Sequence, residues 1–498
     1  MPTFAAIDIG ANSVRLKIAR LARGRLKAIH EDREVTRLGA SVFRTGLLEP
    51  EAMARTVKAL ERFRKAVQAQ RAEVVRAVAT SALRDARNRQ AFVDWARSAT
   101  GWTVEVISGL EEGRLIHLGI MGQARWARAR ALLIDLGGGS CELTFSDAGH
   151  IREMHSLPLG AVRLTSEFLH HDPPKKRELA RMREYIRQEL RRVEARIRAA
   201  RAESVLATSG TAAALAAAAG GASKAASRAQ VARMAARLAE MNAERRQAVR
   251  GIGPRRAEII VAGAAVFDEL MHGYGLRAFR YSDLGLRDGL LAQMAADHGG
   301  RARRQVEAER EDALLETCRK YKADVRQAQR VRETAAQLFA ALRKVHGLPG
   351  SFQDWLLAAA MLSEIGSFVN RTGRHRHAFY LIAHAEIFGF TPRERRLIAT
   401  IARFVGTSKP SPGSKIMAKL RAAEQERVRR AIVLLRMARS LNQGRRGAVT
   451  AVTAAERAGA VTLRLETRGG AELELWALAK ERGNFREVFG REMRIAPG

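Results

Sequence analysis

The chain has 498 residues, and its 87 Lys and Arg against 52 Asp and Glu give a formal net charge of +35. A hydrophobic fraction of 47% and a charged fraction of 28% fit a folded globular protein and exclude a disordered one. No run of 18 apolar residues occurs, which excludes a membrane-spanning helix, and we see no signal peptide.

The positive charge is spread along the whole chain and is somewhat heavier at both ends. A large positive field favours polyanionic partners, namely nucleic acid, an anionic membrane surface or a phosphate polymer. An arginine-rich coding bias is the alternative explanation. Two cysteines, Cys141 and Cys318, are too few for a disulfide framework or a thiolate metal site, so we expect a reducing, cytoplasmic compartment.

The first hundred residues predict a strand hairpin followed by helices around a further strand. Residues 3–9 form a short apolar run, and a turn separates them from residues 14–18, which alternate apolar and polar side chains. Helical spacing of apolar residues follows at 50–71 and 85–98, with a strand predicted at 74–79 between them.

The same pattern returns later in the chain. At an offset of 127 residues Asp8 aligns with Asp135, Gly10 with Gly137 and Ser13 with Ser140. At an offset of 128, Ala79-Thr80-Ser81 aligns with Ala207-Thr208-Ser209. In both copies the triplet closes a short strand and opens a helix. We interpret this as an internal duplication that produces two α/β lobes of one topology.

The remainder of the chain becomes almost wholly helical. Before residue 300 we expect helices at 175–202, 228–250 and 286–296, and residues 299–304 read as a linker. Beyond it we expect helices at 307–346, 352–370, 375–388, 392–405 and 422–442, and strands at 447–466 and 471–477. The predicted domains are therefore residues 1–125, 126–298 and 305–498.

Both predicted hairpin turns carry residues suited to phosphate. Glycine lets backbone N–H groups approach phosphate oxygens, and Ser13 and Ser140 add hydroxyl donors. Asp8 and Asp135 come at strand ends, where a carboxylate can hold a hydrated Mg²⁺. A single turn of this kind is more often a plain hairpin, but a duplicated pair favours a phosphate-binding cleft between two lobes.

Three other segments each have a functional interpretation and a structural one. The small residues of 208–211 precede a helix and suit an anion site, although an ordinary helix N-cap is the favoured explanation of this segment taken alone. Arg84 could form a bidentate contact with phosphate, or lie on the surface. The adjacent Glu111 and Glu112 suit a general base that orients water, or are acidic residues favoured at a helix start.

Together these motifs resemble one family. The matching segments, in order, are residues 8–13 (DIGANS), 79–84 (ATSALR), 107–115 (ISGLEEGRL), 134–143 (IDLGGGSCEL), 157–164 (LPLGAVRL), 207–211 (ATSGT) and 282–289 (SDLGLRDG). They resemble the exopolyphosphatase / guanosine pentaphosphate phosphohydrolase (Ppx/GppA) family over about residues 4–297. The resemblance implies an α/β fold with two duplicated ribonuclease-H-like lobes of the actin-like ATPase and sugar-kinase superfamily, followed by a mainly α-helical, HD-like C-terminal domain.

The resemblance also implies roles for individual residues. Glu112 would be the base that orients the attacking water, with Asp135 and Glu142 as carboxylates that position Mg²⁺ and water and Asp8 as a further metal ligand. The terminal and neighbouring phosphates would be held by Arg84, Gly137, Gly138, Gly139, Ser140, Asn12, Ser13, Ser209, Gly210 and Thr211.

Two departures from the family pattern stand out. Gly113 replaces a usual Ala, which would loosen its helix by up to ~1 kcal/mol. In the C-terminal domain Ser363-Glu364 replaces the His-Asp of HD phosphohydrolases, so a second metal enzyme there is not expected. We expect His375 and His377 to lie at the surface or at a helix start, or to join Arg371, Arg374, Arg376, Arg393, Arg395 and Arg396 in a polyanion-binding patch.

The favoured function is a Mg²⁺-dependent exopolyphosphatase that releases orthophosphate from the ends of inorganic polyphosphate. The alternatives are removal of the 5′-terminal phosphate of pppGpp, which uses the same motifs, and a non-enzymatic, basic polyanion-binding protein. Nucleic acid is a less favoured partner, and membrane insertion is not expected. Longer members of the family tend to dimerise, so a homodimer is expected.

Overall fold

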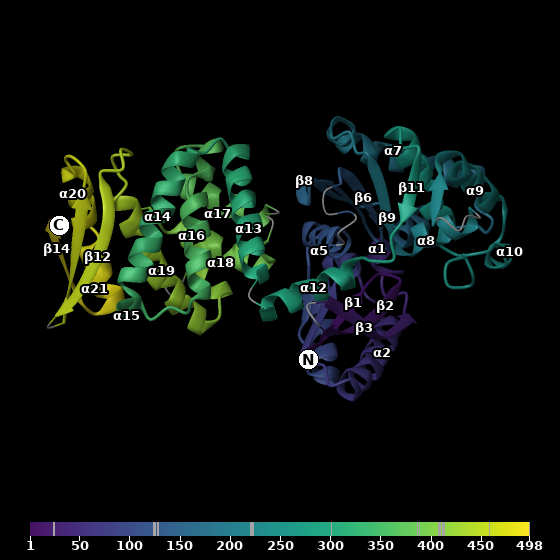
Figure 1. Cartoon of the computed structure of the whole chain (residues 1–498), viewed down its shortest axis with the longest axis horizontal. Coiled ribbons are helices and arrows are strands. Elements are labelled where there is room, and N and C mark those ends of the chain that lie inside the picture. Colours follow the sequence, from purple (N-terminus) through teal and green to yellow (C-terminus); the bar gives the residue numbers. More distant parts are fainter. Residues whose placement is uncertain are drawn as a thin grey trace. The chain divides into compact units, whose positions relative to one another are not determined.

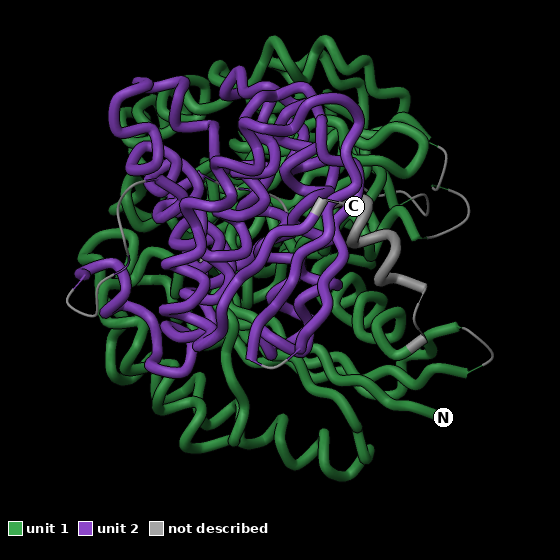
Figure 2. The backbone as a smooth tube through the Cα atoms, turned by 90° about the vertical axis from the view of Figure 1, so that its left-hand side faces the viewer, with its two compact units in different colours: residues 1–303 green, residues 304–498 purple. Residues whose placement is uncertain are grey.

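The protein divides into two compact units, residues 1–303 and 304–498, which are described separately here (Figures 1 and 2). They are seen in a computed structural model. The residues that it describes are 1–22, 25–122, 126, 129–219, 224–299, 301–385, 387, 389–406, 410, 414–457 and 459–497, and side chains within 299–309 and at 392 and 497 are not described.

The first unit begins with a five-stranded sheet in the order β3-β2-β1-β4-β5. Its strands are β1 (Thr3–Ile9), β2 (Ser13–Ala22), β3 (Arg25–Val35), β4 (Val74–Ala79) and β5 (Val104–Val106). The first three strands form an antiparallel meander, whereas β4 and β5 run parallel to β1. Both faces of β1 are covered, which explains its nearly continuous apolar sequence.

A second sheet repeats this topology. Its strands are β6 (Ala131–Leu136), β7 (Cys141–Asp147), β8 (His150–Leu157), β9 (Ser204–Thr208), β10 (Ala225–Ser227) and β11 (Ala278–Tyr281), in the order β10-β11-β9-β6-β7-β8. An antiparallel meander of β6, β7 and β8 is again followed by parallel β9 and β11, and β10 is an added antiparallel edge strand. The two lobes therefore share one topology, as the repeated motifs predicted, and it is the ribonuclease-H-like arrangement that the family resemblance implied.

Helices cover both sheets of the first unit. The first lobe has α1 (Val42–Thr45), α2 (Pro50–Ala69), α3 (Ser81–Asp85), α4 (Arg89–Thr100) and α5 (Gly109–Met121). The second has α6 (Ala161–Phe168), α7 (Lys176–Ala199), α8 (Ser209–Ala218), α9 (Arg228–Glu240), α10 (Ala243–Gln247) and α11 (Ile260–Gly273), followed by α12 (Leu286–Gly299). Each lobe packs a separate apolar core between its sheet and its outer helices.

A third core joins the two lobes. Side chains of β1 and β6 contribute to it, together with α5 and α12. The last helix of the predicted second domain, α12, packs against α5 and β1 of the first lobe. The approach is close: a Cβ on Gly289 would lie 1.8 Å from the carbonyl oxygen of Leu115. The chain thus returns to the first lobe after completing the second.

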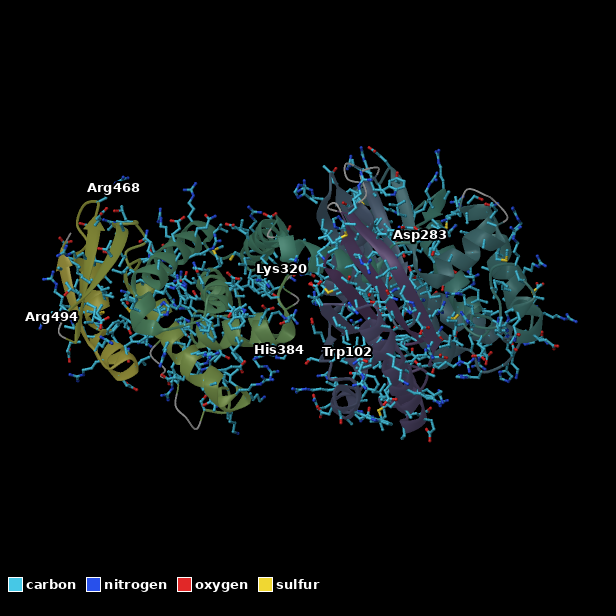
Figure 3. All side chains as sticks on the ribbon, turned by 60° about the horizontal axis from the view of Figure 1, so that its bottom comes forward. Trp102, Asp283, Lys320, His384, Arg468 and Arg494 are labelled. Atoms are coloured by element: carbon cyan, nitrogen blue, oxygen red, sulfur yellow. The ribbon has the colours of Figure 1, made fainter. Side chains whose placement is uncertain are left out.

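The second unit is a helical domain with a small sheet. Its helices are α13 (Arg301–Lys320), α14 (Val325–Ala341), α15 (Arg343–His346), α16 (Ser351–Leu362), η1 (Ile365–Phe368), α17 (Arg374–His384), α18 (Pro392–Arg403), η2 (Met417–Lys419) and α19 (Ala422–Ser440). Then come β12 (Val449–Arg457), β13 (Ala460–Thr467), α20 (Glu472–Ala479), α21 (Arg482–Phe489) and β14 (Glu492–Pro497), with sheet order β12-β13-β14. Lys320 and His384, the last residues of α13 and α17, are labelled in Figure 3. One apolar core runs through the unit.

Several details of the predicted elements were wrong, including the helices expected at 228–250 and 352–370, which are broken after Glu240 and Leu362. Residues 301–304, expected as a linker, form the start of α13, while Gly300 lies outside the described residues. The helix expected at 307–346 is interrupted after Lys320. Residues 471–477, expected as a strand, belong to α20 because Glu, Leu and Ala are strong helix formers, and Glu474, Ala477 and Leu478 share its buried face.

None of the helices, over the residues that the structure describes, is long and apolar enough to cross a membrane. Both cysteines are buried and unpaired by disulfide, in agreement with the expectation that they form no disulfide framework.

Candidate active site

A polar cavity of about 340 Å³ lies between the two lobes of the first unit. Both glycine turns reach it, from the β1–β2 hairpin and from the β6–β7 hairpin. Ten of the predicted site residues line it: Asp8, Asn12, Ser13, Glu112, Asp135, Gly137, Gly138, Ser140, Ser209 and Gly210. The cleft that the duplication predicted is therefore present.

The two turns have the same geometry and nearly touch. The amide of Gly10 donates to the carbonyl of Ser13 over 3.1 Å, and Gly137 donates to Ser140 over 3.0 Å. A Cβ on Gly138 would lie 2.9 Å from the Cβ of Ala11, in the opposite turn. Glycine is needed at position 138 because a side chain would force the two turns apart.

Helix α5 places Glu112 at the cavity wall. The hydroxyl of Ser108 accepts from the amide of Glu111 over 3.1 Å and so caps the helix. Gly109 lets this helix start pack against β8, since a Cβ there would lie 2.2 Å from the Oγ of Ser156. Glu112 is 6% exposed and lies in the first turn, where the helix dipole favours a carboxylate.

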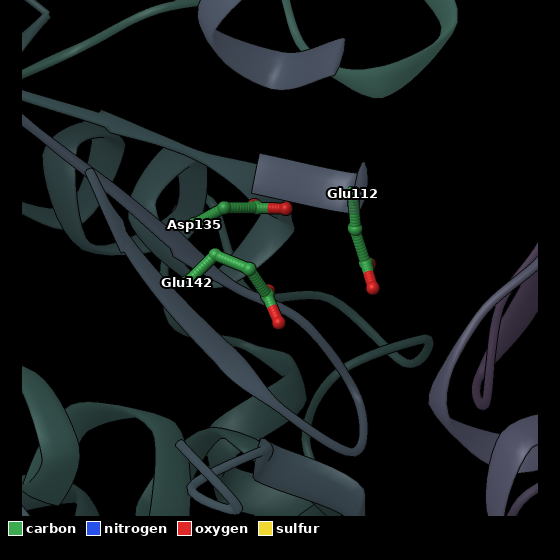
Figure 4. A group of neighbouring side chains, drawn as sticks. All are labelled: Glu112, Asp135 and Glu142. Atoms are coloured by element: carbon green, nitrogen blue, oxygen red, sulfur yellow. The ribbon is translucent and has the colours of Figure 1, made fainter. Parts of the chain in front are cut away.

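Three carboxylates gather at this point (Figure 4). Ligand atoms of Glu112, Asp135 and Glu142 all lie within 4.8 Å of one another. Ser156 donates from its hydroxyl to Oε1 of Glu142 over 2.8 Å, which fixes that carboxylate. The Oε2 atoms of Glu112 and Glu142 are buried and accept no hydrogen bond from the described residues. Such orphaned acceptors indicate a missing partner.

Burial and mutual repulsion raise the pKa values of this cluster. Burial raises the pKa of Glu112 well above its usual range, and the charge of Glu142 adds to the effect. Burial, together with Glu142 and Asp8, raises the pKa of Asp135 to about 8. Burial also raises the pKa of Asp8, although Arg15 opposes it. Carboxylates this close repel one another when ionised, and a cation among them would offset that repulsion.

These donors fit a hard divalent cation. Carboxylate oxygen is the ligand that Mg²⁺ prefers, and two of the oxygens accept no hydrogen bond from the described residues. Within the part of the chain that the structure describes, no other group of three His, Cys, Asp or Glu side chains has this arrangement. Glu112, Asp135 and Glu142 are thus the residues suited to hold a metal, with Asp8 at the same cavity.

Four of the predicted residues do not line the cavity. Arg84 donates to the carbonyl of Ile107 over 2.9 Å, and its Nη1 lies 3.5 Å from Oε2 of Glu112. Its charge lowers the pKa values of Glu112 and Glu142 against the effect of burial. Arg84 therefore contacts the candidate base, not the cavity space. The others are Glu142, which belongs to the carboxylate cluster, Gly139, which packs against Ser81, and Thr211, which packs against Gly263.

Four arginines that the sequence analysis did not single out line the cavity: Arg15 on β2, Arg33 on β3, Arg256 before α11 and Arg287 on α12. Arg287 donates to the carbonyl of Leu16 over 2.9 Å, and Arg256 lies directly over Gly210. Only two positions carried a signal in the sequence: Arg15 aligns with Glu142 at the offset of 127, and Arg287 lies within the motif at 282–289.

The arginines repel one another. Burial, with Arg15 next, lowers the pKa of Arg33 to about 9 and that of Arg256 to about 10. The Nε and Nη2 atoms of Arg33 are buried and donate no hydrogen bond within the described residues. A bound anion would offset this crowded positive charge and could accept from the free donors of Arg33.

The departure at Gly113 has a packing reason. A Cβ there would lie 3.0 Å from the Sδ of Met154 and 3.2 Å from the Oγ1 of Thr144. Glycine allows α5 to pack closely on β7 and β8, so the helix is held by tertiary contacts where its intrinsic propensity is weaker.

In the second unit, Ser363 lies at the C-terminal end of α16. Ser363 is 1% exposed and donates to the carbonyl of Ala360. His375 lies in the first turn of α17, and burial together with nearby arginines lowers its pKa to about 3. The expected basic patch is reduced, because Arg393 pairs with Glu424 and Arg395 is 7% exposed.

Comparison with known proteins agrees with this geometry. The model of the Ppx/GppA phosphatase family matches residues 17–298, and that of Ppx/GppA phosphatase, domain III, matches residues 310–481. The chain belongs to the Ppx/GppA phosphatase family. The second unit accordingly matches the third domain of the longer Ppx/GppA proteins.

Solved structures of similar proteins cover about three fifths of this Ppx/GppA phosphatase. The Ppx/GppA family member of Aquifex aeolicus is 31% identical, with a TM-score of 0.52, over 60% of this chain and 98% of that one. An exopolyphosphatase from Cytophaga hutchinsonii is 25% identical, with a TM-score of 0.56, over 59% and 98%. An exopolyphosphatase-like protein is 28% identical, with a TM-score of 0.55, over 59% and 97%.

Proposed function

We propose that this protein is a Mg²⁺-dependent exopolyphosphatase that hydrolyses the terminal phosphoanhydride bond of inorganic polyphosphate and releases orthophosphate. One observation carries the proposal: a cluster of three carboxylates adjoins a polar cavity that is also lined by four arginines. Membership of a phosphatase family and similarity to a protein described as an exopolyphosphatase support it.

Glu112 is the proposed base. Ser108 caps the helix start that carries it, and its carboxylate lies 3.5 Å from Arg84, whose charge favours the ionised form. From the cavity wall it orients a water molecule towards the terminal phosphorus and accepts a proton as the P–O bond to the rest of the chain breaks. Backbone amides of the Gly137–Ser140 turn then bind the terminal phosphate, and those of the Asn12–Ser13 turn bind its neighbour.

Asp135 and Glu142 would hold Mg²⁺, with Asp8 close by, because their oxygens are clustered and partly unpartnered. When bound, the ion neutralises negative charge on the phosphates and on the carboxylates. Ser156 is a positioning residue, since it holds Glu142 through a single hydrogen bond.

The character of the cavity wall favours an inorganic chain over pppGpp. Among the lining residues that the structure describes, Tyr281 is the one aromatic side chain, and most of the others are polar, charged or glycine. A guanine base would therefore find a single ring for stacking, whereas phosphates meet Arg15, Arg33, Arg256 and Arg287. A non-enzymatic polyanion-binding role leaves the clustered carboxylates unexplained.

The deciding experiment compares substrates under one set of conditions. Phosphate release is measured from long-chain polyphosphate, tripolyphosphate and pppGpp, each with Mg²⁺ and with EDTA. We expect kcat/KM to be highest for polyphosphate and turnover to stop in EDTA. A higher kcat/KM for pppGpp would show that pppGpp is the preferred substrate. Tight, salt-sensitive binding of polyphosphate without turnover would show that the protein binds polyanions and is not an enzyme.

A further inference from the structure

One arginine of the second lobe contacts the Gly137–Ser140 turn and the first lobe at the same time. Arg163 lies in the first turn of α6, and its side chain is 16% exposed. Its Nε donates to the carbonyl of Gly139 over 2.8 Å, and its Nη2 pairs with Asp85, the last residue of α3. The guanidinium also lies over the ring of Phe43 on α1, 4.1 Å from the ring centroid.

The backbone at the start of α6 holds the same turn by its carbonyl groups. The amide of Ala161 donates to the carbonyl of Gly137 over 3.1 Å. The amide of Val162 donates to the carbonyl of Gly138 over 2.8 Å. With the contact that the Arg163 side chain makes, three successive carbonyls of the turn have donors on α6.

Holding the carbonyls orients the amides of the turn. The C=O and N–H groups of a planar trans peptide point in opposite directions. The carbonyl of Gly139, which Arg163 holds, shares its peptide group with the amide of Ser140, and the other two carbonyls fix the amides of Gly138 and Gly139 in the same way. No backbone carbonyl of the described residues accepts from these three amides. They are the free donors that the proposed hydrolysis assigns to the terminal phosphate.

The partner of Arg163 in the first lobe adjoins the candidate base. Asp85 directly follows Arg84 on α3. Arg84 lies 3.5 Å from Oε2 of Glu112 and donates to the carbonyl of Ile107 over 2.9 Å. Arg163 therefore connects the turn of the second lobe to the short helix of the first lobe that contacts Glu112.

Two other contacts join the lobes without bonding to this turn. Ser166 of α6 donates to the carbonyl of Ala40 over 3.1 Å, and Arg37 pairs with Glu258 over 2.8 Å. The side chains of Arg37 and Glu258 are both more than half exposed, so water screens this pair and it contributes little to stability. Arg163 differs from both, because it is largely buried and bonds the turn itself.

We propose that Arg163 is a positioning residue that orients the amides of the Gly137–Ser140 turn and fixes them relative to Glu112. The inference rests on the proposed function, in which these amides bind the terminal phosphate. Oriented amides stabilise the charge of that phosphate most in the transition state, which depends on their placement. The four arginines of the cavity bind the rest of the substrate chain. Loss of Arg163 should therefore lower kcat more than it raises KM.

The test compares Arg163→Ala with the wild-type chain by steady-state kinetics and by calorimetric titration with orthovanadate. Orthovanadate takes up the five-coordinate geometry of a phosphoryl-transfer transition state and probes the turn without turnover. We expect kcat for polyphosphate to fall about 10–100-fold, KM to rise less than about threefold, and the Kd of orthovanadate to rise about 10–100-fold.

Arg37→Gln is the matched control. It removes an arginine that also pairs across the lobes but does not bond the turn. All three quantities should stay within about twofold of the wild-type values. An equal fall of kcat in Arg37→Gln and Arg163→Ala would overturn the proposal, because any contact between the lobes would then have the same effect.

Arg163→Lys keeps the test decisive if Arg163→Ala does not fold. Lys retains the positive charge beside Asp85 and Phe43, but its single ammonium replaces the planar fork that bonds Gly139 and Asp85 together. We expect a Tm close to that of the wild-type chain and a kcat at least about fivefold lower. Unchanged kcat and unchanged orthovanadate affinity in Arg163→Lys would overturn the proposal.

A double-mutant cycle tests the link between the lobes. Asp85→Asn should lower kcat in the same direction as Arg163→Ala, and the double variant should have about the kcat of Arg163→Ala alone, because both substitutions break one connection. Losses that multiply would overturn the assignment of Asp85 as the anchor of Arg163.

Orthovanadate binding separates this inference from the proposed function. If no polyphosphate is hydrolysed but the affinity for orthovanadate falls in Arg163→Ala and Arg163→Lys, the substrate assignment fails and the role of Arg163 stands. If polyphosphate is hydrolysed and neither kcat nor orthovanadate affinity changes in the two variants, the role of Arg163 fails and the proposed function stands.

Discussion

Arg15 and Glu142 occupy the same position in the two duplicated lobes. Arg15 faces Asp8 across the β1–β2 hairpin, and Glu142 faces Asp135 across the β6–β7 hairpin. One copy of the hairpin therefore presents a cation at the cavity and the other presents an additional carboxylate beside it. Opposite charges at equivalent positions let one lobe attract phosphate while the other forms the proposed metal site.

Glu112→Gln should abolish most of the turnover. Gln keeps the size of the side chain but cannot accept the proton, so we expect kcat to fall by about 10²–10⁴. Binding of polyphosphate should persist, because the arginines remain. Glu111→Gln is the matched control, since Glu111 is adjacent but pairs with Arg114 instead of joining the carboxylate cluster. Phosphate release that is equally fast in both variants would show that Glu112 is not the base.

Arg33→Gln should weaken substrate binding and stabilise the fold. Nε and Nη2 of Arg33 are buried without hydrogen-bond partners, and its neighbours repel it. Removing this charge should raise KM for polyphosphate about tenfold and raise the free energy of unfolding by about 1 kcal/mol. Steady-state kinetics and urea denaturation measure the two effects. A lower free energy of unfolding in the variant would show that Arg33 stabilises the fold.

Removing divalent metal should destabilise the protein more at high pH than at low pH. The pKa of Asp135 is raised to about 8, so the folded state binds a proton that the unfolded state releases near pH 4. The free energy of unfolding in EDTA therefore falls as the pH rises from about 4 to about 8.

Mg²⁺ should reverse this loss, because it binds the ionised carboxylates. Thermal melts at pH 6 and pH 8.5, each with Mg²⁺ and with EDTA, should show the larger gain in Tm at pH 8.5. Saturation to ~100 times Kd adds about 2.7 kcal/mol. Asp135→Asn should show a much smaller gain, and an equal gain in the variant would place the ion elsewhere.

Gly109→Ala should disturb the site through Ser156. The new Cβ would lie 2.2 Å from the Oγ of Ser156 and 2.4 Å from its Cβ, so β8 and α5 must separate. We expect a loss of stability of about 1–3 kcal/mol and a lower kcat, since Ser156 positions Glu142. Gly109→Ala/Ser156→Gly should recover stability without recovering activity. Additive effects of the two substitutions would exclude this contact as the cause.

The sequence predicted the features that repeat or that follow local rules. The aligned Asp8 and Asp135, with their glycine turns, were enough to place two hairpins in equivalent lobes on one cleft. The alternating Glu and Leu residues of 472–475 fit a strand by their period of two, but the segment forms part of α20, in agreement with its strong helix propensity.

Sequence patterns could not predict which residues from distant segments meet at the cavity. Arg33, Arg256 and Arg287 come from distant segments and meet only in the folded unit. In a chain with 87 basic residues, no one of them stands out by composition. Arg84 was expected at the phosphate, but its contacts with Ile107 and Glu112 depend on how α3 packs against the start of α5.

The return of α12 to the first lobe has a consequence for biosynthesis. Both sheets are encoded before residue 286, yet Gly285, Leu286 and Arg287 complete the cavity wall and α12 closes the core between the lobes. A nascent chain emerging from the ribosome can therefore form either sheet before the cavity exists. A substrate therefore meets a finished site only after residues 286–299 have left the exit tunnel and docked.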